Sequence, residues 1–483
     1  MKSFKKVMAF LLALVMVMSM VACGSDKKDD NKKDDSNTPA GGEVTDGGEN
    51  TDDTDGDGYT VLKDANGNVY DLGGMEIILG DWWTPDEVTE PKNAYDEARR
   101  DYLNFVQETY NFKIKQCAIS SWGDMPTDFV NFATSGGPEN YVFIMRQGGE
   151  LISAVQNGLM YDLSTLDCLD FSEAKWDKTV EKIGTVGTAR YLMRGEEHEP
   201  TTGVYFNKRL LKEAGVDPQS IYDMQANNTW TWEAFEGVLE KIKADTDGDG
   251  VIDRFAMTNF TSGNLFPAAI WSNGGSVIEQ DANGKFYNNF ESDATLEAMN
   301  WAMELVDKYE MIYPADAAWD YTYSAFRNGE AAFTSGRAYQ AGQDYKDMED
   351  DFGFVCFPMG PRMDHYCNLA TDNCFAIPAC YDADRAWKIA FAYNLWSDPV
   401  PGFEDYSPMS QGYYNSMRDA ESVEETIALL IKSPVADLTG CVAGIDLGPQ
   451  MYWAINKENT PAAQAEAMRD TWQSFIDTAN GVQ

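Results

Sequence analysis

Apolar and polar positions alternate along residues 59–483 with the periods of short strands and amphipathic helices. Residues 75–79 and 141–145 are short apolar runs, which predict two buried strands. Between these runs, residues 95–106 carry apolar side chains three and four positions apart, which predicts a helix. Strands separated by long helical crossovers are typical of an α/β fold.

The middle of the chain continues this pattern. An apolar run at residues 204–206 leads into a predicted helix, which Asn207 can cap and Gly215 can end. Thr231 and Asp293 are expected to cap two further helices. The second of these should direct four side chains toward the core: Leu296, Met299, Met303 and Val306.

Turn signals and a further helical stretch complete the prediction. Asn-Gly pairs at residues 66–67 and 283–284 predict two β-hairpins. Residues 386–396 predict a helix rich in aromatic side chains, and the last hundred residues predict mainly helices joined by loops. Secondary structure is therefore expected throughout the region after residue 58.

Residues 1–22 have the form of an export signal peptide. Three lysines precede an uncharged apolar run at residues 7–20, shorter than the ~20 apolar residues that a spanning helix needs. The run ends in small residues before Cys23, as in the lipobox of bacterial lipoproteins. That resemblance implies cleavage before Cys23 and acylation of its thiol with palmitate, which would anchor the chain to a membrane through lipid alone. An ordinary signal peptide with an incidental cysteine is the alternative.

The segment after Cys23 is expected to be a tether. Residues 24–58 contain 12 acidic and four basic residues and hardly any apolar ones. Such a segment cannot bury enough apolar surface to fold, so residues 23–58 are interpreted as a lipidated cysteine followed by a disordered acidic linker.

Charge excludes several classes of function. The whole chain has 37 Lys and Arg against 79 Asp and Glu, a formal net charge of −42. A chain this acidic is repelled by nucleic-acid phosphates and by anionic lipid headgroups, so no nucleic-acid partner is expected. Histidine occurs only at positions 198 and 365, which argues against histidine-based catalysis and histidine-rich zinc sites.

The seven cysteines after Cys23 are scattered along the chain, so they are expected to be small buried hydrophobes, although a Cys367–Cys374 disulfide is an alternative.

Aromatic residues are abundant. The 13 Trp, 24 Tyr and 24 Phe exceed the number that a core needs. Exposed aromatic faces suit ligands with flat, partly apolar surfaces, so a binding function is favoured.

Several segments resemble, in sequence and in order, those of one protein family. They are residues 203–215, 216–218, 229–235, 271–275, 326–333, 354–361 and 381–387. The chain from about residue 72 onward thereby resembles the bacterial extracellular solute-binding lipoproteins of ABC sugar importers, family 1, which are similar to maltodextrin-binding proteins. The ordered series is a more specific signal than any single motif.

This resemblance implies a two-lobed α/β fold of the periplasmic-binding-protein type II, with a hinge and a ligand cleft between the lobes. We expect residues 59–188 plus 364–401 to form lobe 1 and residues 189–363 plus 402–483 to form lobe 2. The implied function is capture of a carbohydrate, expected to be an oligosaccharide, and its delivery to the permease of an ABC importer. The protein would be a monomer without catalytic residues, at the outer face of the bacterial cytoplasmic membrane.

Candidate ligand-binding residues come from strand ends and from the resemblance. Because ligands of open α/β sheets lie beyond the carboxyl ends of strands, Trp82, Trp83 and Arg146 are expected at the cleft. One of the two tryptophans should pack inward, since neighbouring strand residues face opposite ways. Trp271 and Asn273 precede a Gly-Gly turn and are further candidates. The resemblance adds Tyr339, Asp372 and Tyr413.

An acidic loop predicts a structural calcium site away from the sugar. Asp245, Asp247, Asp249 and Asp253 occupy positions 1, 3, 5 and 9 of a calcium-loop pattern, with Gly250 at position 6. The backbone carbonyl of Val251 would be the ligand at position 7. Position 12 is Ala256 in place of the usual glutamate, so weak binding is expected. A solvated acidic turn is the alternative.

Two other functions remain open at the level of sequence. A secreted glycoside hydrolase would need a carboxylate pair about 5–9.5 Å apart, and the many acidic residues supply candidates without a recognisable setting. A non-catalytic surface adhesin would respond to no small ligand. Sugar that stays intact and raises the melting temperature indicates a binding protein, whereas cleaved sugar indicates a hydrolase.

Overall fold

The computed structural model describes residues 59–86, 90–146, 149–258, 262–318, 320–370 and 373–481. The chain divides into residues 1–60 and 61–483, and the second unit contains all the helices and strands with described bounds. The predicted signal peptide, Cys23 and the tether lie outside the described residues.

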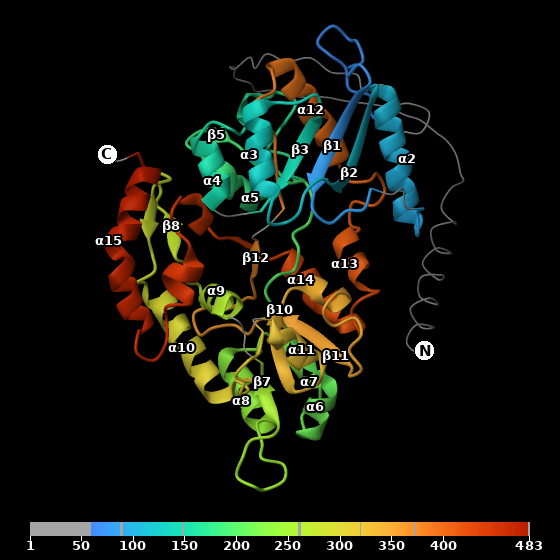
Figure 1. Cartoon of the computed structure of the whole chain (residues 1–483). Coiled ribbons are helices and arrows are strands. Elements are labelled where there is room, and N and C mark those ends of the chain that lie inside the picture. The colour runs from blue at the N-terminus through green and yellow to red at the C-terminus, as the bar shows by residue number, and fades with distance from the viewer. Residues whose placement is uncertain are drawn as a thin grey trace, which may run out of the picture. The chain divides into compact units, whose positions relative to one another are not determined.

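The first of two four-stranded sheets has the order β13-β3-β1-β2, and Figure 1 shows β3, β1 and β2 side by side. It consists of β1 (Met75–Asp81), β2 (Phe112–Ala118), β3 (Asn140–Met145) and β13 (Cys374–Ala376). The first three strands are parallel, and β13 pairs with β3 in the antiparallel sense. The carboxyl ends of β1, β2 and β3 therefore open on one edge of the sheet.

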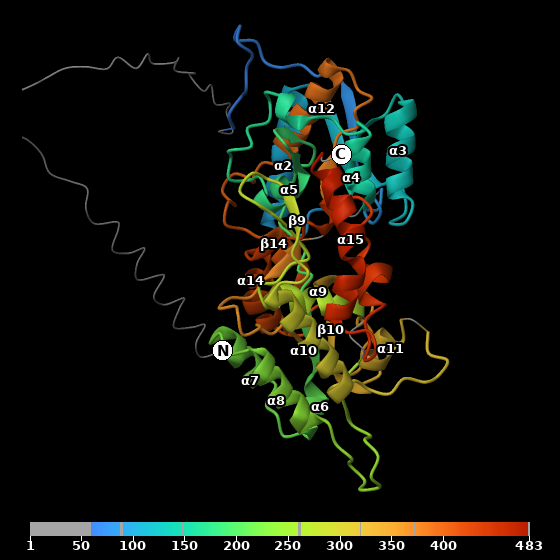
Figure 2. The same ribbon diagram turned by 90° about the vertical axis from the view of Figure 1, so that its left-hand side faces the viewer.

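Helices cover both faces of this sheet. They are α2 (Ala94–Thr109), α3 (Met125–Ser135), α4 (Gly149–Gln156), α5 (Lys178–Gly184) and α12 (Ala383–Trp396). Figure 2 shows α3 on one side of the strands and α2 with α12 on the other. Asn93 caps α2, which buries Tyr102 and Val106. The predicted helix at residues 95–106 is thus confirmed.

The second sheet has the order β11-β6-β10-β7. Its strands are β6 (Gly203–Asn207), β7 (Phe255–Met257), β10 (Ala331–Gly336) and β11 (Phe352–Cys356). β6 runs antiparallel to both of its neighbours, and every residue of β6, β10 and β11 is buried. Its surrounding helices are α6 (Lys208–Glu213), α7 (Gln219–Ala226), α8 (Trp232–Ile242), α9 (Ser262–Ser272), α10 (Asp293–Tyr309) and α11 (Tyr321–Arg327).

Three two-stranded ladders and the C-terminal segment complete the unit. The ladders are β4 (Thr185–Val186) with β5 (Ala189–Arg190), β8 (Ile278–Gln280) with β9 (Phe286–Asn288), and β12 (Asn368–Ala370) with β14 (Pro434–Ala436). The segment also contains α13 (Pro408–Tyr413), α14 (Ala428–Ile431) and α15 (Pro461–Ala479). Short helical turns are η1 (Leu163–Thr165), η2 (Ala338–Gly342), η3 (Ser422–Ile427), η4 (Thr439–Cys441) and η5 (Gly448–Tyr452).

Local caps and turns follow the sequence closely. The side chain of Asn207 accepts hydrogen bonds from two backbone N–H groups and caps α6, and Thr231 caps α8. Gly215 has φ +72°, as the end of a helix requires. β8 and β9 confirm the hairpin around residues 283–284, whereas the turn at residues 66–67 closes a single bridge between Lys63 and Val69.

One detail of the helix prediction was wrong. Ser292 caps α10 and Asp293 is its first residue, because the Ser292 hydroxyl accepts the Thr295 N–H. The predicted stripe of α10 is largely confirmed, because Met299 is fully buried and Met303 and Val306 are half-buried against the core, while Leu296 is half-buried. The fully buried residues are Thr295, Ala298, Met299, Ala302, Leu305 and Tyr309, so this face combines large and small side chains.

The cysteines form no disulfide within the described part of the chain. Five of the seven are buried, as expected for small hydrophobes, whereas Cys168 is half-buried and Cys380 is exposed. Cys367 and Cys374 are both free thiols, so the alternative of a bridge between them was wrong.

Glu310, the C-terminal cap of α10, predicts a pH-dependent stability. Burial raises the pKa of its carboxyl from 4.5 to about 7. The folded state therefore holds this proton more tightly than the unfolded chain does, so the stability contributed by Glu310 is fully present below about pH 4.5 and is lost as the pH rises through about 7. We expect Glu310→Gln to stabilise the protein by about 1–2 kcal/mol at pH 8 and to have little effect at pH 4, measured by urea unfolding.

Glu233→Gln is the matched control, because Glu233 is an exposed residue of α8 and its replacement changes the net charge equally. Equal effects of the two substitutions at both pH values would contradict the role of Glu310.

Candidate functional site

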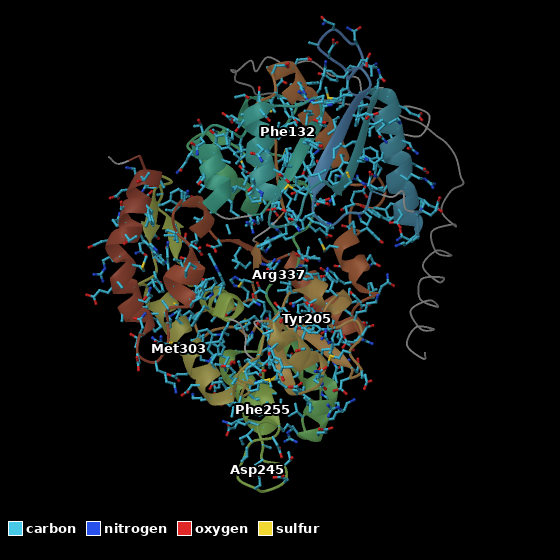
Figure 3. All side chains as sticks on the ribbon, in the orientation of Figure 1. Phe132, Tyr205, Asp245, Phe255, Met303 and Arg337 are labelled. Atoms are coloured by element: carbon cyan, nitrogen blue, oxygen red, sulfur yellow. The ribbon has the colours of Figure 1, made fainter. Side chains whose placement is uncertain are left out.

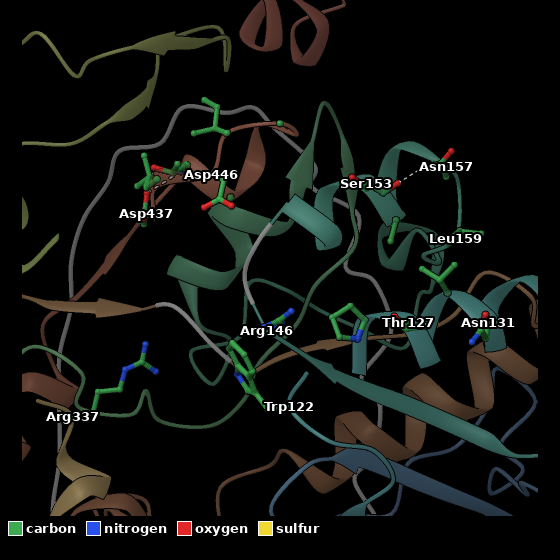
Figure 4. A pocket seen from close by; sticks show the side chains of 18 of the residues that line it. Trp122, Thr127, Asn131, Arg146, Ser153, Asn157, Leu159, Arg337, Asp437 and Asp446 are labelled. Carbon is green, nitrogen blue, oxygen red and sulfur yellow. Dashed lines mark hydrogen bonds between the residues drawn. The ribbon is translucent and has the colours of Figure 1, made fainter. Parts of the chain in front are cut away.

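A cavity of about 1540 Å³ lies between segments attached to the first sheet and segments attached to the second (Figure 4). One wall comes from α3, from α4 and from residues that follow β2 and β3. The other wall comes from α9, α11 and η2, and the segment that follows β14 also lines the cavity and contacts α4. Its principal polar and aromatic lining residues are Trp122, Thr127, Asn131, Arg146, Asn157, Asn264, Tyr323, Arg337, Tyr339, Asp437 and Asp446.

Trp122 and Arg146 form one side-chain pair on the first wall. They follow β2 and β3, whose carboxyl ends share one edge of the parallel sheet. The guanidinium carbon of Arg146 lies 4.0 Å from the centre of the Trp122 ring, a cation–π contact that orients both groups. Trp122 nevertheless stays 54% exposed, so it offers a large aromatic surface to a ligand.

Tyr339 is the corresponding aromatic residue on the second wall. It lies in η2, directly after Arg337 and Ala338, and is 38% exposed. The hydroxyl of buried Tyr205 donates to the Arg337 carbonyl at 2.8 Å and accepts the Ala341 N–H at 3.1 Å, which fixes this turn. Burial raises the pKa of the Tyr339 hydroxyl. The protonated hydroxyl can both donate and accept a hydrogen bond.

Asp437 contributes a carboxyl group from a distant part of the chain. It follows β14, which reaches the cavity because it pairs with β12. The Thr439 hydroxyl and backbone N–H donate to Asp437 at 2.6 and 2.9 Å. Burial raises the pKa of the Asp437 carboxyl, and these two hydrogen bonds partly offset the rise. The cavity thus combines aromatic faces with planar hydrogen-bonding groups, a combination that can bind a polyhydroxylated ring compound.

The structure brings together two of the residues proposed from sequence, Arg146 and Tyr339, and leaves others away from the cavity wall. Trp82 is half-buried against the core and Trp83 is 46% exposed, which confirms that one of the pair packs inward. Their rings lie 5.0 Å apart, edge to face. Asp81 fixes this turn by accepting the N–H groups of Trp83 and Thr84, both at 3.0 Å.

Trp271 and Asn273 lie around the C-terminal end of α9, and neither lines the cavity. Asn273 is fully buried, and its side-chain amide donates to the Ala294 carbonyl and to Glu297, both at 3.0 Å. Its carbonyl oxygen accepts the Arg362 N–H. These hydrogen bonds link the Asn273 side chain to α10 and to the residues after β11. The amide therefore has a structural role.

Tyr413 interacts electrostatically with Tyr339 of the second wall but does not itself line the cavity. Burial and a hydrogen bond with Glu199 raise the pKa of its hydroxyl. Asp372, the remaining candidate ligand residue, lies outside the described residues.

Trp122, Arg337 and Asp437 were not predicted from the sequence. The signal for Trp122 was the alternation of apolar and polar residues from Phe112 to Lys115, which marks β2 as an edge strand with a loop after it. Asp437 has no such local signal, because its position depends on the pairing of β14 with a strand more than sixty residues earlier.

The acidic loop at residues 245–253 lies at the tip of the connection between α8 and β7, away from Arg337 (Figure 3). Carboxylate oxygens of Asp245, Asp247 and Asp253 all lie within 4.8 Å of one another. The backbone N–H groups of Gly250 and Gly248 donate to Asp245 and hold the pKa of its carboxyl below the usual range. Asp249 accepts the Val251 N–H at 2.8 Å and does not belong to this group of three.

Comparison with known proteins assigns the family. The sequence model of the bacterial extracellular solute-binding proteins matches residues 94–388, which is more than half of the chain. The chain belongs to this family. A relative of this solute-binding protein, an uncharacterized ABC transporter extracellular-binding protein of Pyrococcus horikoshii, is 22% identical over 376 residues, or 72% of this chain and 77% of the relative.

Solved structures share the fold. The GacH receptor of Streptomyces glaucescens, solved unliganded and with acarbose, has a TM-score of 0.54 at 16% identity, covering 84% of this chain and 99% of its own. A substrate-binding protein of Listeria monocytogenes in complex with cycloalternan has a TM-score of 0.55 at 16% identity, covering 85% and 100%. The expected α/β fold of the type II periplasmic binding proteins is thereby confirmed.

Membership of the family fixes the general function. The protein binds a small molecule outside the cytoplasm for an ABC transporter and is not an enzyme. Among the described residues, no helix has both the length and the apolar character needed to cross a bilayer.

Proposed function

We propose that this solute-binding protein captures an oligosaccharide in the cavity lined by Trp122 and Tyr339 and delivers it to the permease of an ABC importer. The observation that carries the proposal is that aromatic and planar polar side chains from both walls line one cavity. Sugars present apolar C–H faces and many hydroxyls, and they need such a mixed surface. Movement of the two walls toward each other around the ligand would complete the site.

The size of the cavity supports a ligand of several rings. Small-molecule sites usually measure about 300–1,000 Å³, and this cavity measures about 1540 Å³. The ligands in two solved structures with this fold, acarbose and cycloalternan, are consistent with the same class. The lobe boundaries proposed near residues 188, 364 and 401 and the monomeric state remain part of this proposal.

A panel of oligosaccharides tests the function. Thermal unfolding should show a raised melting temperature with at least one oligosaccharide, because a ligand that binds only the native state stabilises it. Chromatography of the same mixtures should show the sugar intact. Cleaved sugar would instead support a glycoside hydrolase. A panel in which no oligosaccharide changes the melting temperature would favour an adhesin.

We also propose that Cys23 is lipidated after removal of residues 1–22 and anchors the protein to the outer face of the cytoplasmic membrane. In cells, Cys23→Ser should move the protein from the membrane fraction to the medium, detected by immunoblotting. Wild-type protein found mainly in the medium would contradict the anchor.

The acidic loop is proposed to bind calcium in a structural role. Three carboxylates around one point supply hard oxygen ligands, and the absence of the usual glutamate implies millimolar affinity. At about 10 mM Ca²⁺ we expect the melting temperature to rise by about 1–3 °C, and the double variant Asp245→Asn/Asp247→Asn to lose this rise. An equal rise in wild type and variant would contradict a site at this loop.

A further inference from the structure

A second cavity, of about 560 Å³, lies between α5 with the β4–β5 ladder and the β8–β9 hairpin with the end of α15. Its residues are distinct from those that line the sugar cavity. We define this second cavity as the lysine groove, because Lys178, Lys182 and Lys285 all line it. Three lysines around one groove contrast with the formal charge of −42 of the whole chain.

The charges in the lysine groove do not cancel. Among the described residues of its wall, Glu181 is the only acidic one, and its carboxylate already forms ion pairs with Arg190 at 2.6 Å and Lys178 at 3.0 Å. Among the described residues, no carboxylate lies within ion-pair distance of Lys182 or Lys285. Two ammonium groups therefore remain available to a ligand.

Asp281 of the hairpin interacts electrostatically with Lys285 but forms no ion pair with it within 4.0 Å among the described residues. Asp281 accepts the backbone N–H groups of Asn283 and Lys285 at 2.8 and 3.0 Å, so its carboxylate closes the turn. It does not belong to the groove wall. The remaining wall contains amide side chains and the half-buried ring of Phe286, so it offers further hydrogen-bond groups beside the two lysines.

We propose that the lysine groove binds a small multivalent oxyanion, with Lys182 and Lys285 as its principal contacts. The volume lies within the range of small-molecule sites. Lysine ammonium groups bind phosphate or carboxylate groups as point charges and do not impose the planar geometry of arginine. The ligand class is therefore a compact di- or polyanion that carries phosphate or carboxylate groups. Such a site is separate from the proposed sugar site and does not depend on it.

Another role for Lys182 makes a different prediction. It lies in the last turn of α5, where a positive charge favours the helix end. If both lysines served only the stability of the fold, their removal would lower the melting temperature without changing the binding of any anion.

Isothermal titration of the whole protein with inorganic pyrophosphate and, separately, citrate tests the proposal in calcium-free buffer of low ionic strength. We expect saturable binding of at least one anion to a single site, weakened at least about tenfold in Lys182→Gln/Lys285→Gln. Lys212→Gln/Lys241→Gln, which removes two exposed lysines elsewhere, should bind within about twofold of wild type. Preference for pyrophosphate or for citrate identifies the phosphate or the carboxylate source.

Three results would overturn the proposal: no binding of either anion, equal weakening in both double variants, or full binding in Lys182→Gln/Lys285→Gln. If that variant fails to fold, Glu181→Gln provides the test. It removes the acidic residue of the wall and should tighten binding severalfold, and unchanged or weaker binding would count against the groove.

Discussion

Replacing Trp122 with alanine is expected to weaken binding of the best oligosaccharide by about 30-fold, which corresponds to ~2 kcal/mol. Trp122 presents the most exposed aromatic surface among the residues that line the sugar cavity, and Arg146 holds its ring from one side. Loss of the indole removes both the stacking surface and the cation–π partner of Arg146. Isothermal titration of the purified variant measures the change.

Trp453→Ala is the matched control for this prediction. Trp453 is 69% exposed and does not line the sugar cavity, so its removal should leave the affinity unchanged. Tyr339→Ala, on the opposite wall, should weaken binding as well. Unchanged affinity in both Trp122→Ala and Tyr339→Ala would show that the sugar binds elsewhere.

Replacing Arg194 with methionine is expected to lower the free energy of unfolding by about 3–4 kcal/mol. Arg194 is 2% exposed, and its guanidinium donates to the carbonyls of Glu196, Glu197 and Asn373. Met193, the residue before Arg194, forms an antiparallel β-bridge with Phe375 of β13. Arg194 therefore links the segment around residue 196 to the segment around residue 373. Methionine at this position would leave three backbone carbonyls without their hydrogen-bond donor.

Urea unfolding at neutral pH measures this loss. Arg100→Met is the control, because Arg100 is half-exposed on α2 and its ion pair with Asp101 is long, at 3.4 Å. The control should change stability by less than about 0.5 kcal/mol. A loss below about 1 kcal/mol in Arg194→Met would contradict the structural role of this residue.

Local patterns in the sequence predicted much of the fold. Apolar runs located β1, β3 and β6, and the caps Asn207 and Thr231 marked the starts of α6 and α8, because these signals depend on neighbouring residues alone. β2 was missed because its polar positions include two lysines, which an edge strand tolerates on its exposed side. The core-facing stripe of α10 was predicted largely correctly, whereas its cap was placed one residue late, because both Ser292 and Asp293 are residue types that cap helices.

The residues of the sugar cavity were predicted only in part, because some of them depend on local sequence signals and others on long-range contacts. Arg146 follows a strand that the sequence identifies, and Tyr339 follows a recognisable segment, so both could be proposed. Trp122 depends on the unpredicted β2. Asp437 depends on a long-range strand pair, and Asn273 is committed to hydrogen bonds inside the fold that no local pattern encodes.

The crystal structure of the protein with the best oligosaccharide from the panel tests the central claim most directly. We predict that its sugar rings lie in the cavity between the two sheets and contact Trp122 and Tyr339, with hydroxyls hydrogen-bonded to Arg146. A sugar bound against Trp271, or at any surface outside this cavity, would contradict the account.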